Sequence, residues 1–264
     1  MNPARDTPTV PSGALRRAAA LAGAHPGPGG YAVAYGSHAS GHGRPTSDLD
    51  LLFVHDRPAT PCAELVTAVI ALHPGEGLTL DTEVRHDVKL CASFDDIDQA
   101  TALAGFGAPH LRVTPVTDDP EELNAAPFRL RLFLSALSGP HMFLAGDLTA
   151  YRRHTAAADR ATAQLALALL GCPTAAPTVT EAAGCLLTGP GGHRGKDWLG
   201  WEEGPALYAT LHRGLAALNG SGLLSGPDHE GRYRTRARPT AGHAATALTP
   251  RGAPTRPGPV PNPR

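Results

Sequence analysis

The chain has 264 residues, of which 42% are hydrophobic and 18% charged, and its formal net charge is −1. This composition suits one large globular domain or two smaller ones, and it excludes a chain that is disordered throughout. The near-neutral charge argues against a strongly basic nucleic-acid surface, and because no apolar run approaches 18 residues we expect a soluble, cytoplasmic protein without membrane spans.

The first third of the chain alternates between helix and strand patterns. Ser12 is a suitable N-cap for the first helix, and Pro61 suits the first turn of the second. The apolar and alternating runs between them are typical of strands, and we expect the second strand to pair with the first. The predicted helices cover residues 12–25 and 61–73, and the predicted strands cover residues 31–35 (YAVAY), 48–54 (DLDLLFV) and 78–85 (LTLDTEVR).

A Gly-Ser pair follows the first predicted strand, and an acidic pair opens the second. Asp48 and Asp50 flank Leu49, so in a strand they share one face, about 7 Å apart along the chain. Two carboxylates beside apolar residues are costly without a positive charge between them, and hard oxygen ligands favour Mg²⁺. Gly36 lets the backbone approach a ligand, and a helix beginning near Ser37 would direct free N–H groups at an anion. A phosphate-binding turn beside a metal-binding carboxylate pair is what nucleotide chemistry requires.

This pattern resembles the signature of the polymerase-beta-like nucleotidyltransferase superfamily, a Gly-Ser pair followed across a loop by Asp-x-Asp in a strand. The chain looks most like small bacterial antibiotic adenylyltransferases and minimal nucleotidyltransferases, and the resemblance covers residues 13–95. It implies transfer of a nucleoside monophosphate from a nucleoside triphosphate, with ATP as the expected donor, to an acceptor hydroxyl, with release of pyrophosphate. The roles that it implies are ligation of two Mg²⁺ ions by Asp48 and Asp50, and triphosphate binding by Gly36, Ser37 and Ser47.

A third carboxylate is also implied, because in this superfamily one reaches the site from a neighbouring strand. It binds the metal ion at the acceptor or takes the acceptor's proton. Asp81 and Glu83 share one face of the predicted strand over residues 78–85, and both are candidates for catalysis and metal binding. Asp81 follows apolar Leu80, the commoner pattern, whereas Glu83 precedes Val84 as in aminoglycoside enzymes.

Helical patterns dominate the second half of the chain. Ser93 is a suitable N-cap followed by acidic residues, and Thr178 with Glu181 has the capping-box pattern. The predicted helices cover residues 93–104, 149–170, 178–187 and 205–218. We therefore predict an α/β fold in which a mixed sheet flanked by helices (13–117) is followed by a helical substrate domain (118–224) and a disordered tail (225–264).

The sequence does not identify the acceptor. We expect a small molecule such as an antibiotic; the alternatives are a protein- or tRNA-modifying transferase of a toxin–antitoxin type and a non-catalytic nucleotide-binding module. The near-neutral charge weighs against nucleic acid as the partner. The glycine-rich residues 189–200 do not form a Walker motif, because Pro190 replaces the first glycine and Asp197 follows Lys196.

Overall fold

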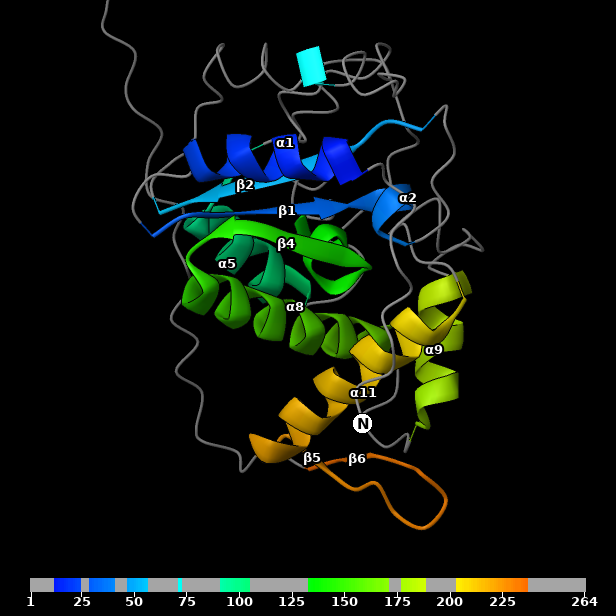
Figure 1. Ribbon diagram of the computed structural model, residues 1–264. Helices are drawn as coiled ribbons and strands as arrows, with labels where there is room; N and C mark the ends of the chain where they lie inside the picture. The colour runs from blue at the N-terminus through cyan, green and yellow to red at the C-terminus, as the bar shows by residue number, and fades with distance from the viewer. Residues whose placement is uncertain are drawn as a thin grey trace, which may run out of the picture.

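A computed structural model describes residues 12–24, 29–40, 47–56, 71–72, 91–104, 133–170, 177–188 and 203–236 (Figure 1). The helices are α1 (Ser12–Ala24), α2 (Gly36–Ala39), α5 (Phe94–Ala104), α8 (Leu148–Leu169), α9 (Val179–Thr188) and α11 (Pro205–Gly220), and residues 133–138 are also helical. The strands are β1 (Tyr31–Tyr35), β2 (Asp50–His55), β3 (Cys91–Ser93), β4 (His141–Gly146), β5 (Leu224–Ser225) and β6 (Arg234–Thr235). Within these ranges, no helix has both the length and the apolar character that crossing a membrane requires.

Four strands of the described part form one mixed sheet in the order β3-β2-β1-β4. β1 pairs antiparallel with β2 on one side and with β4 on the other, and β3 runs parallel to β2. All five residues of β1 are buried, as expected for a strand that is covered on both faces. The predicted pairing of the first two strands and the predicted mixed sheet flanked by helices are therefore confirmed.

Two strands of the sheet, β3 and β4, were not expected from the sequence, which predicted strands over residues 31–35, 48–54 and 78–85. β4 comes from a segment in which only helices were predicted, and it lies beside β1 (Figure 1). Its residues HMFLAG are half-buried and show no strict alternation, so their pattern does not indicate a strand. The division at residue 117 stays a prediction, but the sheet draws one strand from beyond it.

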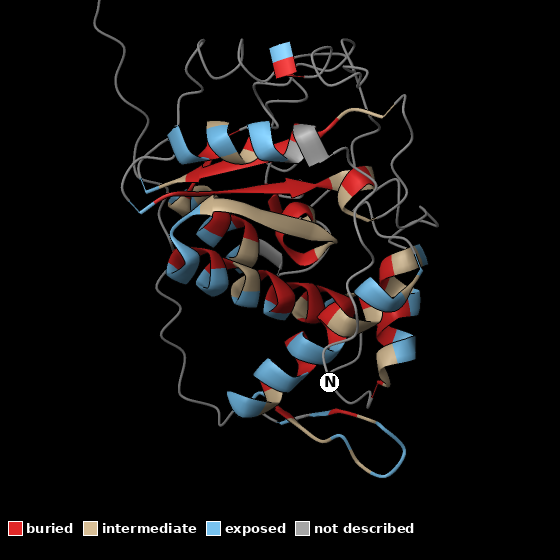
Figure 2. Ribbon diagram, viewed as in Figure 1, coloured by how far each residue is buried: buried red, intermediate tan, exposed pale blue. Residues whose placement is uncertain are grey.

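The two faces of the sheet carry separate hydrophobic clusters. Because successive strand residues point to opposite faces, Val33 joins the cluster beneath α5 and α8, whereas Ala32 and Ala34 join the cluster beneath α1. Figure 2 shows β1 and β2 largely buried between these helices, and α1 with an exposed outer face. In the same way, Tyr31, Tyr35, Leu52 and Val54 face α5 and α8, and Leu49, Leu51 and Phe53 face α1.

Polar side chains at the predicted positions define the helix starts. The Ser93 hydroxyl accepts a hydrogen bond from the Asp96 N–H (3.1 Å), and the Asp96 carboxylate accepts from the Ser93 N–H (2.8 Å). Thr178 and Glu181 form the same reciprocal pair at the start of α9. Asp147 is the N-cap of the long helix α8, and its carboxylate accepts from two backbone N–H groups. Such caps satisfy donors that have no partner within the helix.

Helices α8 and α11 cross closely because one of them has a glycine at the contact. A β-carbon at Gly214 would overlap the backbone oxygen of Asp159 on α8 and lie 2.8 Å from the Ala163 side chain. Beside this contact, Arg213 donates to both carboxylate oxygens of Asp159, at 2.6 and 3.2 Å. Burial raises the pKa of Asp159, and the hydrogen bonds from Arg213 oppose that rise.

The predicted disordered tail begins too early in the sequence. β5 and β6 form an antiparallel pair, and Tyr233 is buried and donates its backbone N–H to the Pro177 carbonyl oxygen. The connecting turn is held by the Asp228 carboxylate, which accepts hydrogen bonds from the N–H groups of Glu230 and Arg232. The Gly, Pro and Asp residues of this segment therefore form a turn. Residues 237–264 lie outside the described residues.

Candidate functional site

The Gly-Ser turn and the acidic pair meet at the end of the sheet. Gly36 follows β1 with a φ of +75°, a backbone conformation that L side chains rarely adopt. A β-carbon at this position would overlap Oδ2 of Asp50 and lie 2.9 Å from its Cγ. Because Gly36 has no side chain, the Asp50 carboxylate can lie directly against the turn. Only glycine accommodates both the backbone conformation and this contact.

A buried tyrosine lies across the strands from the acidic pair. Tyr35 is paired with Asp50 across the strands and is 7% exposed. Its hydroxyl has no hydrogen-bond partner within the described part of the chain. Burial raises the pKa of Tyr35 well above its usual value, and the negative charges of Asp50 and Asp48 raise it further. The tyrosine is therefore neutral, so its hydroxyl can donate a proton to a hydrogen bond.

A histidine ties the turn to the residue before the acidic pair. His38, in α2, is 2% exposed, and its Nε2 lies 3.1 Å from the Ser47 carbonyl oxygen. A carbonyl oxygen only accepts hydrogen bonds, so Nε2 carries the proton and donates it. The other ring nitrogen, Nδ1, is buried without a partner among the described residues. This bond sets where the chain re-enters the site just ahead of Asp48.

Polar residues continue across the sheet from the acidic pair. Tyr35 in β1 is paired with Asp50 of β2 and with His141 of β4, so the three side chains share one face of the sheet. The Nδ1 atom of His141 donates to the Gly139 carbonyl oxygen (2.8 Å), and its Nε2 lies 2.9 Å from the Tyr151 hydroxyl. His141 thus has hydrogen-bond partners for both ring nitrogens, whereas the buried hydroxyl of Tyr35 has no partner in the described part.

A second polar group lies on the same face at the other end of β1. The Tyr31 hydroxyl is 2.9 Å from Nδ1 of buried His154, and Arg153 donates to the Nε2 atom of His154. Since Nε2 accepts, Nδ1 carries the proton and donates to Tyr31. Burial lowers the pKa of His154 to about 4, with a further contribution from the charge of Arg153 and an opposing one from Asp98. The polar atoms of this group have hydrogen-bond partners and His154 is neutral, which is typical of a cluster that stabilises the fold.

The sequence-predicted site residues divide into two sets. The structure brings Gly36 against Asp50, and Asp48 lies close enough to Tyr35 to influence its pKa. Ser37 is the second residue of α2, and Ser47 is reached by His38. Asp81 and Glu83 lie outside the described residues. Among the described residues, no group of three or more His, Cys, Asp or Glu side chains could hold a metal ion.

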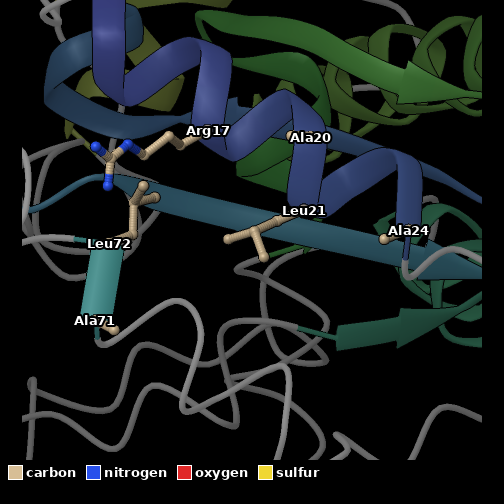
Figure 3. Close-up of a pocket in the computed structure, with 6 residues that line it drawn as sticks. All are labelled: Arg17, Ala20, Leu21, Ala24, Ala71 and Leu72. Atoms are coloured by element: carbon tan, nitrogen blue, oxygen red, sulfur yellow. The ribbon is translucent and has the colours of Figure 1, made fainter.

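A hollow lined by described residues lies on the other side of the sheet. It has a volume of about 410 Å³ and is lined by two elements, α1 and residues 71–72 (Figure 3). Its lining residues are Arg17, Ala20, Leu21, Ala24, Ala71 and Leu72. This lining is apolar apart from Arg17 and holds no carboxylate, so the hollow does not extend the acidic site.

Two residues of this site were not predicted from the sequence. In the sequence, Tyr35 is simply the last residue of an apolar strand, and only the pairing register places it opposite Asp50. The sequence pattern gives His38 no role, because its contact with the Ser47 carbonyl oxygen depends on the tertiary structure. A signal for Tyr35 was present: a polar-tipped residue directly before the Gly-Ser turn on an otherwise apolar strand.

Comparison of the whole chain with protein-family models, with curated proteins and with solved structures finds no match in any of the three.

Proposed function

We propose that the chain is a metal-dependent nucleotidyltransferase. It transfers a nucleoside monophosphate from a nucleoside triphosphate, with ATP as the expected donor, to a hydroxyl group of a small molecule such as an antibiotic, and it releases pyrophosphate. The observation that carries the proposal is the contact between Gly36, in its left-handed conformation, and the carboxylate of Asp50. That contact joins the Gly-Ser turn to the acidic pair, two motifs that are separate in the sequence.

The chemistry of the donor set supports a hard divalent cation. Asp48 and Asp50 provide carboxylate oxygens, the ligand type that Mg²⁺ prefers. No ion pair joins Asp48 to a cation within the described residues, so its charge is not neutralised by the protein there. The buried Tyr35 hydroxyl adds a hydrogen-bond donor beside the same carboxylates. Asp48 and Asp50 would hold the cation, with Asp81 or Glu83 as the third carboxylate.

Each residue of the predicted site then has a role in the transfer. The acceptor oxygen attacks the α-phosphorus, the bond from that phosphorus to the oxygen bridging to the β-phosphate breaks, and pyrophosphate leaves. Asp81 or Glu83 takes the proton of the acceptor hydroxyl. Gly36 and Ser37 bind the triphosphate through backbone N–H groups at the turn. Bound Mg²⁺ supplies stabilisation of the charge that develops on the phosphate oxygens.

Incubation with α-³²P-labelled nucleoside triphosphates and Mg²⁺ tests the proposal. Pools of small molecules, tRNA and proteins serve as acceptors in separate reactions, and we expect label in the small-molecule pool. Asp48→Asn and Asp50→Asn should each abolish labelling without unfolding the protein, because each removes an anionic ligand. Asp56→Asn is the matched control, since Asp56 is an exposed carboxylate at the far end of β2.

The outcomes separate the rival functions. Label in the tRNA or protein pool would show that the acceptor is a macromolecule, and the proposed reaction would still stand. Triphosphate binding with no labelled product in any pool would favour a non-catalytic nucleotide-binding module. Near-wild-type labelling by Asp50→Asn would refute the assignment of the acidic pair.

The third carboxylate is tested by Asp81→Asn and Glu83→Gln. We expect only one of these two variants to reduce labelling as much as Asp48→Asn, because the two residues lie about 7 Å apart along a strand.

A further inference from the structure

The Tyr35 hydroxyl is a buried donor that lacks an acceptor among the described residues. It comes from the central strand of the sheet, next to the turn at Gly36, and the side chain is 7% exposed. The great majority of buried polar side-chain atoms in proteins have a hydrogen-bond partner, so one without a partner requires an explanation. Removing such a group from water without a compensating bond is unfavourable for folding.

The surroundings of this hydroxyl indicate what it binds. Asp50 is the cross-strand neighbour of Tyr35, and the negative charges of Asp50 and Asp48 both raise the pKa of Tyr35. Neither carboxylate accepts its proton in the structure. A neutral hydroxyl near two anions is a donor, and an oxygen atom held between those anions and the hydroxyl would complete its hydrogen bonding. A water molecule that donates its protons to the carboxylates could take this place, and so could an oxygen coordinated to a cation that the two carboxylates hold. The repulsion between two neighbouring carboxylates favours the cation.

We propose that the Tyr35 hydroxyl donates a hydrogen bond to an oxygen ligand of the divalent cation held by Asp48 and Asp50. Tyr35 is thus a positioning residue: it orients a cation ligand and does not itself react. This inference rests on the proposed function. The oxygen belongs either to a coordinated water molecule or to a phosphate group of the nucleotide, and both are acceptors of the same kind.

Tyr31 is a matched control for Tyr35. The two tyrosines are four residues apart on the same strand and face the same side of the sheet. Both are buried, but the Tyr31 hydroxyl has a partner, Nδ1 of His154 at 2.9 Å. Removing the hydroxyl from Tyr31 leaves the buried His154 N–H without an acceptor, whereas removing it from Tyr35 eliminates an unpaired group. The two substitutions should therefore affect stability in opposite directions.

The test measures Mn²⁺ binding to full-length wild type, Tyr35→Phe and Tyr31→Phe by electron paramagnetic resonance, with thermal unfolding of the metal-free proteins in parallel. One arm contains Mn²⁺ alone, and the other adds a non-hydrolysable ATP analogue. We expect Tyr35→Phe to keep or raise the Tm but to bind Mn²⁺ about 10-fold more weakly, the usual consequence of losing a group that orients a metal ligand. Tyr31→Phe should lower the Tm by about 2–6 °C and bind Mn²⁺ like the wild type.

The two arms identify the source of the oxygen. A loss of affinity by Tyr35→Phe with Mn²⁺ alone assigns the bond to a coordinated water, and a loss only with the analogue assigns it to a phosphate oxygen. If the wild type binds Mn²⁺ and Tyr35→Phe binds it equally well in both arms, the inference fails while the proposed function stands. Equal losses of Mn²⁺ affinity in Tyr35→Phe and Tyr31→Phe would also overturn the inference, because the loss would then not depend on the Tyr35 hydroxyl. A wild type that binds no Mn²⁺ in either arm would refute both the proposed function and this inference.

Discussion

Replacing Gly36 by alanine tests how the turn positions the acidic pair. The new β-carbon would overlap Oδ2 of Asp50, which is the end of a flexible side chain. The side chain of Asp50 can therefore rotate away at little expense to the fold, but the carboxylate then leaves its position. We expect Gly36→Ala to impair cation binding and transfer far more than it impairs folding.

The magnitude follows from two separate contributions. A left-handed backbone conformation costs an alanine about 1–2 kcal/mol, so the free energy of unfolding should fall by roughly that amount. Displacing one carboxylate by about 1 Å can reduce activity by about 100-fold, and loss of a positioned metal ligand reduces affinity by about 10- to 100-fold. The free energy of unfolding of an ordinary protein is on the order of 5–15 kcal/mol, so the variant should remain folded after a loss of about 1–2 kcal/mol. The loss of function should therefore be larger than the loss of stability explains.

Gly222 offers a control with the same backbone conformation. Its φ is +77°, close to the +75° of Gly36, and no atom lies within 4 Å of the position that a β-carbon would occupy. Gly222→Ala should therefore lose a similar free energy of unfolding in urea titrations and keep full Mn²⁺ affinity and transfer activity. The reasoning is refuted if both variants lose equal stability and bind Mn²⁺ equally well, because the contact between Gly36 and Asp50 would then be irrelevant to the site.

Three further predictions concern the stability of the fold and the position of the acidic pair. Because the pKa of His154 is about 4 in the folded protein and 6.5 in the unfolded chain, the unfolded state binds more protons between these values. The free energy of unfolding should consequently fall by about 2 kcal/mol from pH 7.5 to about pH 5, as measured by urea titration. Arg213→Ala leaves the buried carboxylate of Asp159 without its cation, and we expect a loss of about 2 kcal/mol in the same assay, less than for a fully buried pair because Arg213 is 57% exposed. His38→Asn, which cannot reach the carbonyl oxygen ahead of the acidic pair, should weaken Mn²⁺ binding, whereas His38→Gln, whose amide can replace Nε2, should retain it.

Each of these predictions has its own control. His154→Gln should show a smaller pH dependence than the wild type, and an unchanged slope would assign the effect to other groups. Arg232→Ala breaks an exposed contact with Glu181 at 3.5 Å and should leave stability close to that of the wild type. Equal losses for Arg232→Ala and Arg213→Ala would contradict the role of burial. Equal Mn²⁺ affinity for the two His38 variants would show that the bond to the carbonyl is dispensable.

Local patterns in the sequence were sufficient for most of the described helices and for β1 and β2, but not for β3, β4, β5 and β6. The capping pair Thr178 and Glu181 marks the start of α9, and the apolar run YAVAY corresponds to β1 without a shift. Signals of this kind succeed because capping and side-chain periodicity act between residues that are close in the chain. They also located the turn at Gly36 and the acidic pair that the proposed site depends on. Candidates for the third carboxylate, Asp81 and Glu83, were likewise named from the sequence and stay a prediction.

Only the tertiary structure decided which of these residues meet. The register that pairs Tyr35 with Asp50 and with His141 joins three strands, one of them β4, whose sequence does not indicate a strand. Pairing register depends on contacts between distant segments and on the packing of both sheet faces, so no local pattern contains it. For the same reason, the sequence alone could not indicate that the buried Tyr35 hydroxyl has no partner among the described residues, or that His38 bonds to the Ser47 carbonyl oxygen.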